Sequence, residues 1–253
     1  MKLKIFATVI LMISLSGCAE LTKVLQTAGG SLPLTEADVV AGLKEALNTG
    51  ARNSAQKLAA ENGYYADIAV KILLPEEARV IVENVSRIPG GEKLVEDVIL
   101  RINRAAEDAA KEAAPIFVNS VTKMSIADAF GILRGSDNAA TTYLRNTTHS
   151  ELYNLYKPKI RTSTEKKLIG NVSTKDSWVT LTSRWNTFAN SIAGKVAGLK
   201  PVNTDLDDYL TSKALEGLYS KIAIEELRIR KDVSARVTPI LQRVFGSLDN
   251  TSR

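Results

Sequence analysis

The 253-residue chain has only one cysteine and one histidine, which limits the disulfides, metal sites and histidine-dependent catalytic sites that it can form. One cysteine allows neither an intramolecular disulfide nor a cysteine-based zinc cage. A histidine-rich zinc site needs clustered ligands, and a Ser-His-Asp triad would have to use His149. We expect His149 to be a solvated residue at a helix start, with a general base as the alternative. Because no phosphate-binding glycine loop or dinucleotide fingerprint is present, the sequence predicts no cofactor and no metal.

Aromatic residues are also few, at 6% of the chain, and neither sign of charge dominates. The net charge is +5, and it falls to +3 without Lys2 and Lys4, which lie in a segment that we expect to be removed. The charges are interleaved along the chain rather than clustered, so nucleic acid is not an expected partner. A hydrophobic fraction of 45% with 24% charged residues is typical of a soluble globular domain.

The amino end has the pattern of an export signal. Lys2 and Lys4 precede the apolar run Ile5–Ile13, and the small residues Ser16 and Gly17 follow it. The run is too short for a membrane-spanning helix, which needs about 20 residues. Residues 1–17 are therefore predicted to be a signal peptide.

The residues Leu15-Ser16-Gly17-Cys18 resemble the lipobox of bacterial lipoproteins. This resemblance implies that Cys18 is acylated and that the chain is cut before it. Each buried methylene of an acyl chain contributes about 0.8 kcal/mol, so several chains anchor a protein firmly. Ala19, which is not an aspartate, favours the outer membrane, on the periplasmic side of the envelope, and residues 18–34 would form a tether. The alternative is an ordinary secretory signal with a chance cysteine.

The stretch Gly91–Pro115 is predicted to be the central helix of the domain. Its apolar residues recur every three or four positions over about six turns. The second half of this face is almost entirely alanine, and small side chains let other helices approach closely. We therefore expect this helix to be packed on more than one side and to end or kink at Pro115.

The remaining sequence predicts further helices and no sheet. Helical spacing and capping residues indicate one all-α domain over residues 35–246, a multi-helix bundle, with a frayed tail at 247–253. Asp67–Leu74 lacks helical spacing and is either a short strand or an extended connector. Trp178 and Trp185, seven residues apart, are expected in the core. The other predicted helices are Thr35–Asn62, Pro75–Pro89, Ile116–Met124, Ser125–Gly135, Asn138–Asn146, Thr148–Leu168, Asp176–Ile192, Thr204–Arg230 and Ser234–Phe245.

Polar residues in helical stretches are the candidate site. Asn103 and Glu107 lie four residues apart beside the alanine-rich face and can reach into the packing. A carboxylate near such a core is costly unless it is paired, and Arg230 or Arg134 is the natural partner. The candidates form either a structural ion-pair network or a polar cleft for a ligand, and they are Asn103, Glu107, Arg134, Asp137, Glu225, Glu226 and Arg230.

Several blocks in a fixed order resemble an uncharacterised family of bacterial envelope proteins, domain of unknown function 4197, over roughly Val39–Gly246. The resemblance implies a helical exported domain and names no catalytic residue. Asp232-Val233 stands where the family pattern has Asp-Pro, which puts only a local turn in doubt. The blocks are Asn103–Glu107, Ala114–Phe117, Met124–Ala129, Gly131–Gly135, Ala139–Thr141, Ala214–Leu218, Glu225–Glu226, Ile229–Arg230 and Val244–Gly246.

The sequence thus favours a lipid-anchored envelope protein that is a non-catalytic binding or structural module. Its expected partners are the membrane, through the anchor, and an envelope protein or a small ligand. The alternative is a hydrolase of envelope polymers that uses Glu107 and Glu226 as a carboxylate pair, which requires two carboxyl groups about 5 to 10 Å apart in an open cleft.

Overall fold

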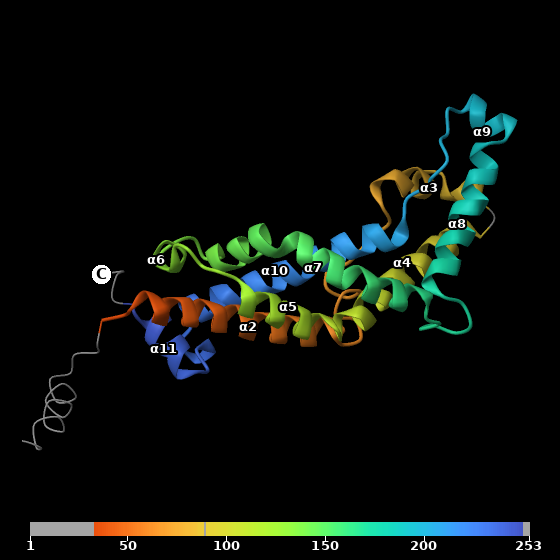
Figure 1. Cartoon of the computed structure of the whole chain (residues 1–253). Helices are drawn as coiled ribbons and strands as arrows, with labels where there is room; N and C mark the ends of the chain where they lie inside the picture. The colour runs from red at the N-terminus through yellow and green to blue at the C-terminus, as the bar shows by residue number, and fades with distance from the viewer. Residues whose placement is uncertain (1–32, 89, 250–253) are drawn as a thin grey trace, which may run out of the picture. The chain divides into compact units, whose positions relative to one another are not determined.

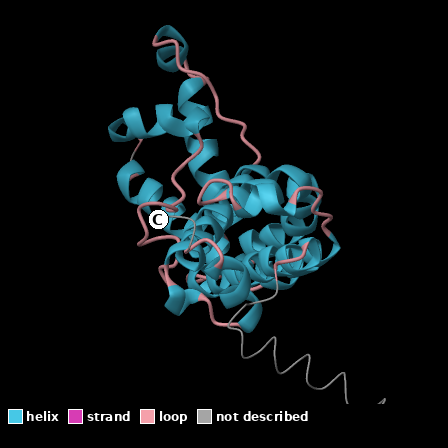
Figure 2. Ribbon diagram, turned by 90° about the vertical axis from the view of Figure 1, so that its left-hand side faces the viewer, coloured by secondary structure: helices cyan, strands magenta, loops and turns pink. Residues whose placement is uncertain are grey.

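Regular secondary structure is helical throughout the described part of the chain. The computed structural model describes residues 33–88 and 90–249, and within them Figure 2 shows helices joined by loops. Residues from Glu36 onward form one compact unit by their contacts. The elements are α2 (Glu36–Ala59), η2 (Glu76–Ala78), α3 (Arg79–Glu83), η3 (Val85–Arg87), α4 (Gly91–Ala110), α5 (Ala113–Lys123), α6 (Ala129–Leu133), α7 (Ala139–Glu165), α8 (Thr174–Ala189), α9 (Ile192–Val196), α10 (Leu206–Lys231), η4 (Val233–Ala235) and α11 (Pro239–Gly246).

The longest pairing in the bundle joins α2 to α10, which run side by side (Figure 1). Both helices bury aliphatic residues at three- and four-residue spacing, as one face of a helix requires. Helix α7 covers α10, α5 covers α2, and α11 packs on α2. The last contact is close because residue 42 is a glycine: a Cβ there would lie 2.7 Å from the Val244 side chain.

Helix α4 is packed by α2, α7 and α8, as the alanine-rich face predicts. Its alanines 105, 106, 109 and 110 are buried, together with Val98 and Ile102. The helix is shorter than predicted, because it ends at Ala110 and α5 begins at Ala113. Pro115 explains the break: its ring would clash with the carbonyl of Lys111 in a continuous helix, whereas the first turn of α5 tolerates it.

A loop between α2 and η2 crosses the bundle and carries residues 60–75. Tyr64 is its buried anchor: the ring lies against Gly217, where a Cβ would be 2.8 Å from the ring, and its hydroxyl donates to the Ala214 carbonyl at 2.8 Å. Within Asp67–Leu74 the structure contains no strand; it has a turn followed by an extended connector, which confirms the second of the two predicted alternatives.

Helix α7 runs without interruption from Ala139 to Glu165, so the predicted break near Thr148 is wrong. The Thr148 hydroxyl donates to the Leu144 carbonyl at 2.6 Å. This bond satisfies the hydroxyl within the helix, so Thr148 does not need to cap a new one. His149 is therefore in mid-helix and only half exposed, which corrects the solvated position expected for it. Its ring lies 6.0 Å from that of Tyr219.

Two other predicted helices are interrupted. The one over Pro75–Pro89 divides into η2, α3 and η3, because the Asn84 side-chain amide donates to the Val80 carbonyl at 3.0 Å and competes with the backbone ladder. The last helix begins at Pro239 rather than Ser234. Proline disfavours the helical conformation in the residue before it, and Thr238 is extended and caps the helix instead.

Candidate functional site

The side chain of Asn103 on α4 binds the backbone of the crossing loop, as a neighbouring strand would. Its Oδ1 accepts from the Ile72 backbone N–H at 2.9 Å, and its Nδ2 donates to the Ile72 carbonyl at 2.7 Å. Val70 and Ile72 on either side of Lys71 are buried, so the connector has the alternation of a strand, although side chains and not a second strand bind its backbone. The Tyr209 hydroxyl also donates to the carbonyl of Leu73, at 2.9 Å. Asn103 therefore fixes the position of this connector on α4.

Glu107, one turn later, holds the start of the same loop. Its Oε1 accepts from the backbone N–H groups of Tyr64 at 3.1 Å and Tyr65 at 3.0 Å, and its Oε2 accepts from Arg104 at 2.5 Å. The predicted burial of Glu107 is confirmed, because it is 4% exposed. The predicted partners, Arg230 or Arg134, are wrong for this carboxylate, since the arginine comes from its own helix one turn away.

Glu226 lies at the amino end of α7, far along the fold from the loop that Glu107 holds. Its two oxygens accept from the backbone N–H of Ala140 at 3.0 Å, from that of Thr141 at 2.7 Å and from the Thr141 hydroxyl at 2.7 Å. A carboxylate at this end of a helix also interacts favourably with the positive end of the helix dipole. The 1% exposed Glu226 thus serves as the cap of α7, which Asn138 does not provide.

Arg230 completes this corner by pairing with Glu226. Its guanidinium lies 2.7 Å from Glu226 Oε1, and it also donates to the carbonyls of Leu133 at 2.7 Å and Ile132 at 3.1 Å, at the end of α6. One ion pair on α10 therefore ties the end of α6 to the start of α7. We call Glu226, Arg230 and the backbone groups they bind the α6–α7 corner.

Arg236 is a buried cation that sequence reasoning missed. It is 2% exposed, and its guanidinium donates to the Ile229 and Arg230 carbonyls at 2.9 and 3.0 Å, where α10 ends. Both oxygens of Asp249 accept from it, at 2.6 and 2.8 Å. These bonds hold Asp249 to the end of α10, within the segment 247–253 for which fraying was expected. The sequence contains no local signal for this buried arginine beyond Pro239, which disfavours the helical conformation at Thr238 and so separates α11 from α10.

Arg134 and Asp137 belong to the surface beside the corner and not to its buried network. Arg134 is exposed and stacks over the Phe130 ring, with 5.2 Å between the guanidinium carbon and the ring centre. Asp137 pairs with Lys231 at 3.0 Å, and both side chains are more than half exposed. Arg134 and Asp137 nevertheless line one hollow of about 370 Å³ together with Arg230, so the structure brings this part of the predicted cluster together.

Glu225 faces a different side of α10 from its neighbour Glu226, because successive residues of a helix are rotated by about 100°. It accepts from Lys57 at 2.6 Å, from Asn53 at 3.0 Å and from Arg228 at 3.1 Å. Burial opposes ionisation of Glu225, but the hydrogen bonds from Lys57 and Asn53 outweigh it and lower the pKa of the carboxyl group. The ion pair between Lys57 and Glu225 links α2 to α10 at the edge of an open hollow.

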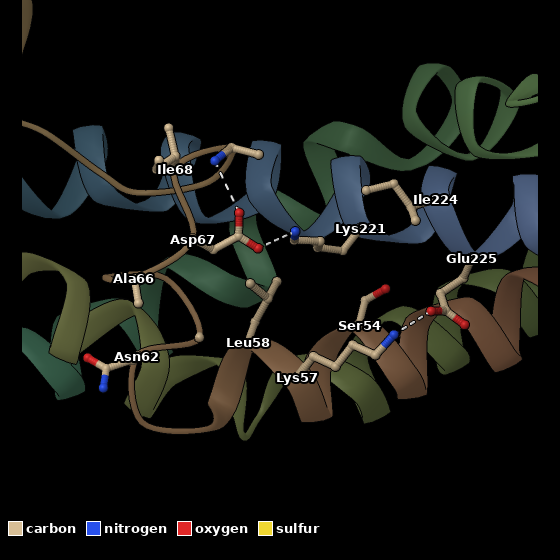
Figure 3. Close-up of a pocket in the computed structure, with 12 residues that line it drawn as sticks. Ser54, Lys57, Leu58, Asn62, Ala66, Asp67, Ile68, Lys221, Ile224 and Glu225 are labelled. Atoms are coloured by element: carbon tan, nitrogen blue, oxygen red, sulfur yellow. Dashed lines mark hydrogen bonds and ion pairs between the residues drawn. The ribbon is translucent and has the colours of Figure 1, made fainter.

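The hollow has a volume of about 740 Å³ and lies between α2, α10 and the crossing loop (Figure 3). Two ion pairs border it, Lys57–Glu225 and Lys221–Asp67, and the hydrogen bond from Lys221 lowers the pKa of Asp67. Between them lies Ser54, whose fully buried hydroxyl has no hydrogen-bond partner among the described residues. The remaining lining residues are Leu58, Asn62, Gly63, Ala66, Ile68, Ala69 and Ile224.

The chemistry available at this hollow is non-covalent recognition. The two lysines and two carboxylates offer ionic groups of both signs, and Ile224 and Ile68, which is 94% exposed, offer apolar surface. Concave sites of this size with a few polar groups on apolar walls are typical of ligand sites. Of the predicted residues only Glu225 lines the hollow. Sequence reasoning missed Ser54, Lys57, Asp67 and Lys221, because they come from three separate segments.

Neither a metal-binding cluster nor a membrane-spanning helix is present among the described residues. No group of three or more histidine, cysteine, aspartate or glutamate side chains in them is arranged to hold a metal ion. No helix among them is both long and apolar enough to cross a bilayer. Cys18 and the predicted signal peptide lie outside the described residues.

Comparison with known proteins identifies a family that most of the chain resembles. The model of a family described as a protein of unknown function, DUF4197, matches residues 33–246. No curated protein and no solved structure matches the chain. The family match confirms the resemblance carried by the sequence blocks, and it begins a few residues earlier than the predicted limit.

Proposed function

The chain belongs to the DUF4197 family, and from this premise we propose that it is a lipid-anchored, non-catalytic binding module of the bacterial envelope. The anchor is Cys18, in the sequence Leu15-Ser16-Gly17-Cys18, and Ala19 directs the protein to the periplasmic side of the outer membrane. Ligand or partner binding takes place at the hollow between α2, α10 and the crossing loop.

One observation carries the non-catalytic part of the proposal. Each oxygen of Glu107 and of Glu226 accepts at least one hydrogen bond from within the fold. A general acid or base must instead reach a substrate proton from an open cleft. The two carboxylates also hold different parts of the chain, Glu107 the crossing loop and Glu226 the start of α7. Their contacts therefore support structural roles and disfavour the carboxylate-pair hydrolase.

The anchor is tested by replacing the lone thiol. Cells expressing the wild type or Cys18→Ser are fed a clickable palmitate analogue, and labelled chains are detected after membrane fractionation. We expect label and membrane association in the wild type, and in the variant an unlabelled chain that is either uncleaved or soluble. An unlabelled wild type that is soluble without detergent would overturn the anchor.

The binding role is tested by site-specific photocrosslinking in intact envelopes. A photoreactive residue replaces Ile68, which is 94% exposed at the rim of the hollow. The matched control replaces Val237, which is 68% exposed and lies outside the hollow. We expect a defined adduct at position 68 and none at 237, with its identity read by mass spectrometry. Absence of an adduct at 68, or the same adducts at both positions, contradicts binding at the hollow.

A further inference from the structure

Helix α9 carries two of the most exposed aliphatic side chains among the described residues. Ile192 and Val196 are each 85% exposed, and because they are four residues apart they share one face of the helix. Ala193 and Ala197, which follow them, are exposed as well. A single exposed aliphatic residue is ordinary, but a pair on one short projecting helix makes a small apolar surface.

The chain around this pair carries cations without acids. Residues 177–204 contain Arg184, Lys195 and Lys200 and no aspartate or glutamate, although 24% of the whole chain is charged. All three side chains are exposed, and none forms an ion pair within residues 33–88 and 90–249. Many other lysines and arginines of the bundle pair with a carboxylate. Positive charge on this segment is therefore left available to an external anion.

The structure presents the pair on an ordered support. The Ser191 hydroxyl accepts from the Gly194 N–H at 3.1 Å and caps α9. The chain that returns from α9 is fixed on α8, because the Trp185 indole donates to the Lys200 carbonyl at 2.9 Å and Asn186 exchanges two hydrogen bonds with Val202. Figure 1 shows α9 at the end of α8. We call residues 174–203 the α8–α9 arm and Ile192–Lys200 its tip.

We propose that the tip of the α8–α9 arm is a contact surface for an anionic lipid bilayer. Aliphatic side chains that enter the acyl boundary while lysines reach the headgroups are the combination that binds membrane surfaces. Negative lipid headgroups complement the unpaired cations. The tip has one short helix and no aromatic anchor, which is little surface for a stable protein interface. This inference is independent of binding at the hollow.

The test places an environment-sensitive fluorophore on the tip. The full chain carrying Cys18→Ser and Ala197→Cys is labelled with NBD and mixed with vesicles of phosphatidylcholine, with or without phosphatidylglycerol. The apolar amino end can bring the chain to either vesicle, so binding of the whole chain is not evidence for a contact at the tip. The emission of the label depends on the surroundings of residue 197 and therefore reports on the tip alone. We expect a several-fold rise and a blue shift of emission on the anionic vesicles, with quenching by a lipid-borne doxyl group. The same label at Asn146→Cys, on the exposed face of α7, should respond less.

Two double variants, each with a matched control, separate the contribution of the aliphatic side chains from that of the lysines. Ile192→Ser/Val196→Ser should abolish the emission change, whereas Val233→Ser/Val237→Ser, which removes two exposed valines elsewhere, should not. Lys195→Gln/Lys200→Gln should weaken it, and Lys93→Gln/Lys167→Gln, with the same change in net charge, should not. A tip label that stays water-like on pelleted anionic vesicles would overturn the proposal. So would an emission change that needs no vesicles and grows with protein concentration, because that outcome assigns the tip to self-association.

Discussion

At the α6–α7 corner Arg230 and Glu226 are 4% and 1% exposed and bind each other, whereas Lys195 and Lys200 on the α8–α9 arm are exposed and have no ion pair among the described residues. The corner uses its charges to satisfy helix ends, which leave backbone groups unpaired. The arm leaves its charges to solvent beside exposed aliphatic residues. The comparison separates charges that the fold buries and satisfies from charges that it leaves exposed and unpaired.

The largest expected effect comes from breaking the corner. Glu226→Ala leaves Arg230 buried without its counter-charge and removes the cap of α7. Breaking a buried pair in this way costs about 3–5 kcal/mol. We expect that loss in the free energy of unfolding, measured by urea denaturation followed by circular dichroism. The control Asp137→Ala, at the exposed pair beside the corner, should cost less than about 1 kcal/mol, and equal losses would contradict the distinction.

A smaller effect is expected where a carboxylate holds a loop. Glu107→Gln keeps an oxygen for the Tyr64 and Tyr65 N–H groups but loses the charge that binds Arg104. We expect a loss of about 1–3 kcal/mol in the free energy of unfolding. Glu61→Gln is the matched control, since Glu61 also contacts Arg104, at 3.3 Å, but its side chain is 81% exposed. If both variants lose the same stability, burial is not what makes Glu107 important.

Glu225 at the hollow is buried and ion-paired, and the pH dependence of unfolding tests its contribution to stability. Despite burial, the hydrogen bonds from Lys57 and Asn53 lower the pKa of Glu225 from its ordinary value of 4.5. A carboxyl whose pKa is lower in the folded state stabilises the fold above pH 4.5, and this stabilisation is lost as the pH falls through the folded-state pKa. Unfolding curves from neutral pH down to acid should therefore be less pH-dependent in Glu225→Gln than in the wild type. Glu165→Gln, at an exposed pair with Lys175, should keep the wild-type slope.

The smallest effect on stability is expected at the tip. Ile192→Ser/Val196→Ser removes side chains that are 85% exposed, so little buried area changes. Thermal unfolding should show a change within about 0.5 kcal/mol, the range for surface substitutions. A larger loss would mean that the pair is packed within the fold, and it would remove the basis for a membrane contact.

The helices could largely be predicted from the sequence because their signals are local. Apolar spacing located α2, α4, α8 and α10. The helix expected from Ser125 begins later, because Asp128 accepts from the Gly131 N–H and caps α6. In contrast, the cap of α10, Asp205, is one residue from the expected start at Thr204. Both tryptophans are buried as expected.

Two errors fall where a side chain bonds its own helix, at Asn84 and Thr148. Two others fall at Pro115 and Pro239, where a proline moves a helix boundary.

The site was harder to predict because its contacts join distant segments. Helical spacing placed Asn103 and Glu107 beside the packed face of α4, and the Glu226–Arg230 pair is an i, i+4 contact. In contrast, Lys57 meets Glu225 across 168 residues, and Lys221 meets Asp67 across 154. No periodicity specifies such pairs, so the hollow became visible only in the folded chain.

The coupling energy between Glu226 and Arg230 tests most directly whether the buried charges are structural. A double-mutant cycle would compare the unfolding free energies of the wild type, Glu226→Leu, Arg230→Met and the double variant. Directly contacting residues have coupling energies of about 0.5–3 kcal/mol, and burial places this pair near the upper end. We predict a coupling of about 2 kcal/mol or more, with the double variant more stable than either single one. Additive losses, with a coupling below about 0.5 kcal/mol, would contradict the account.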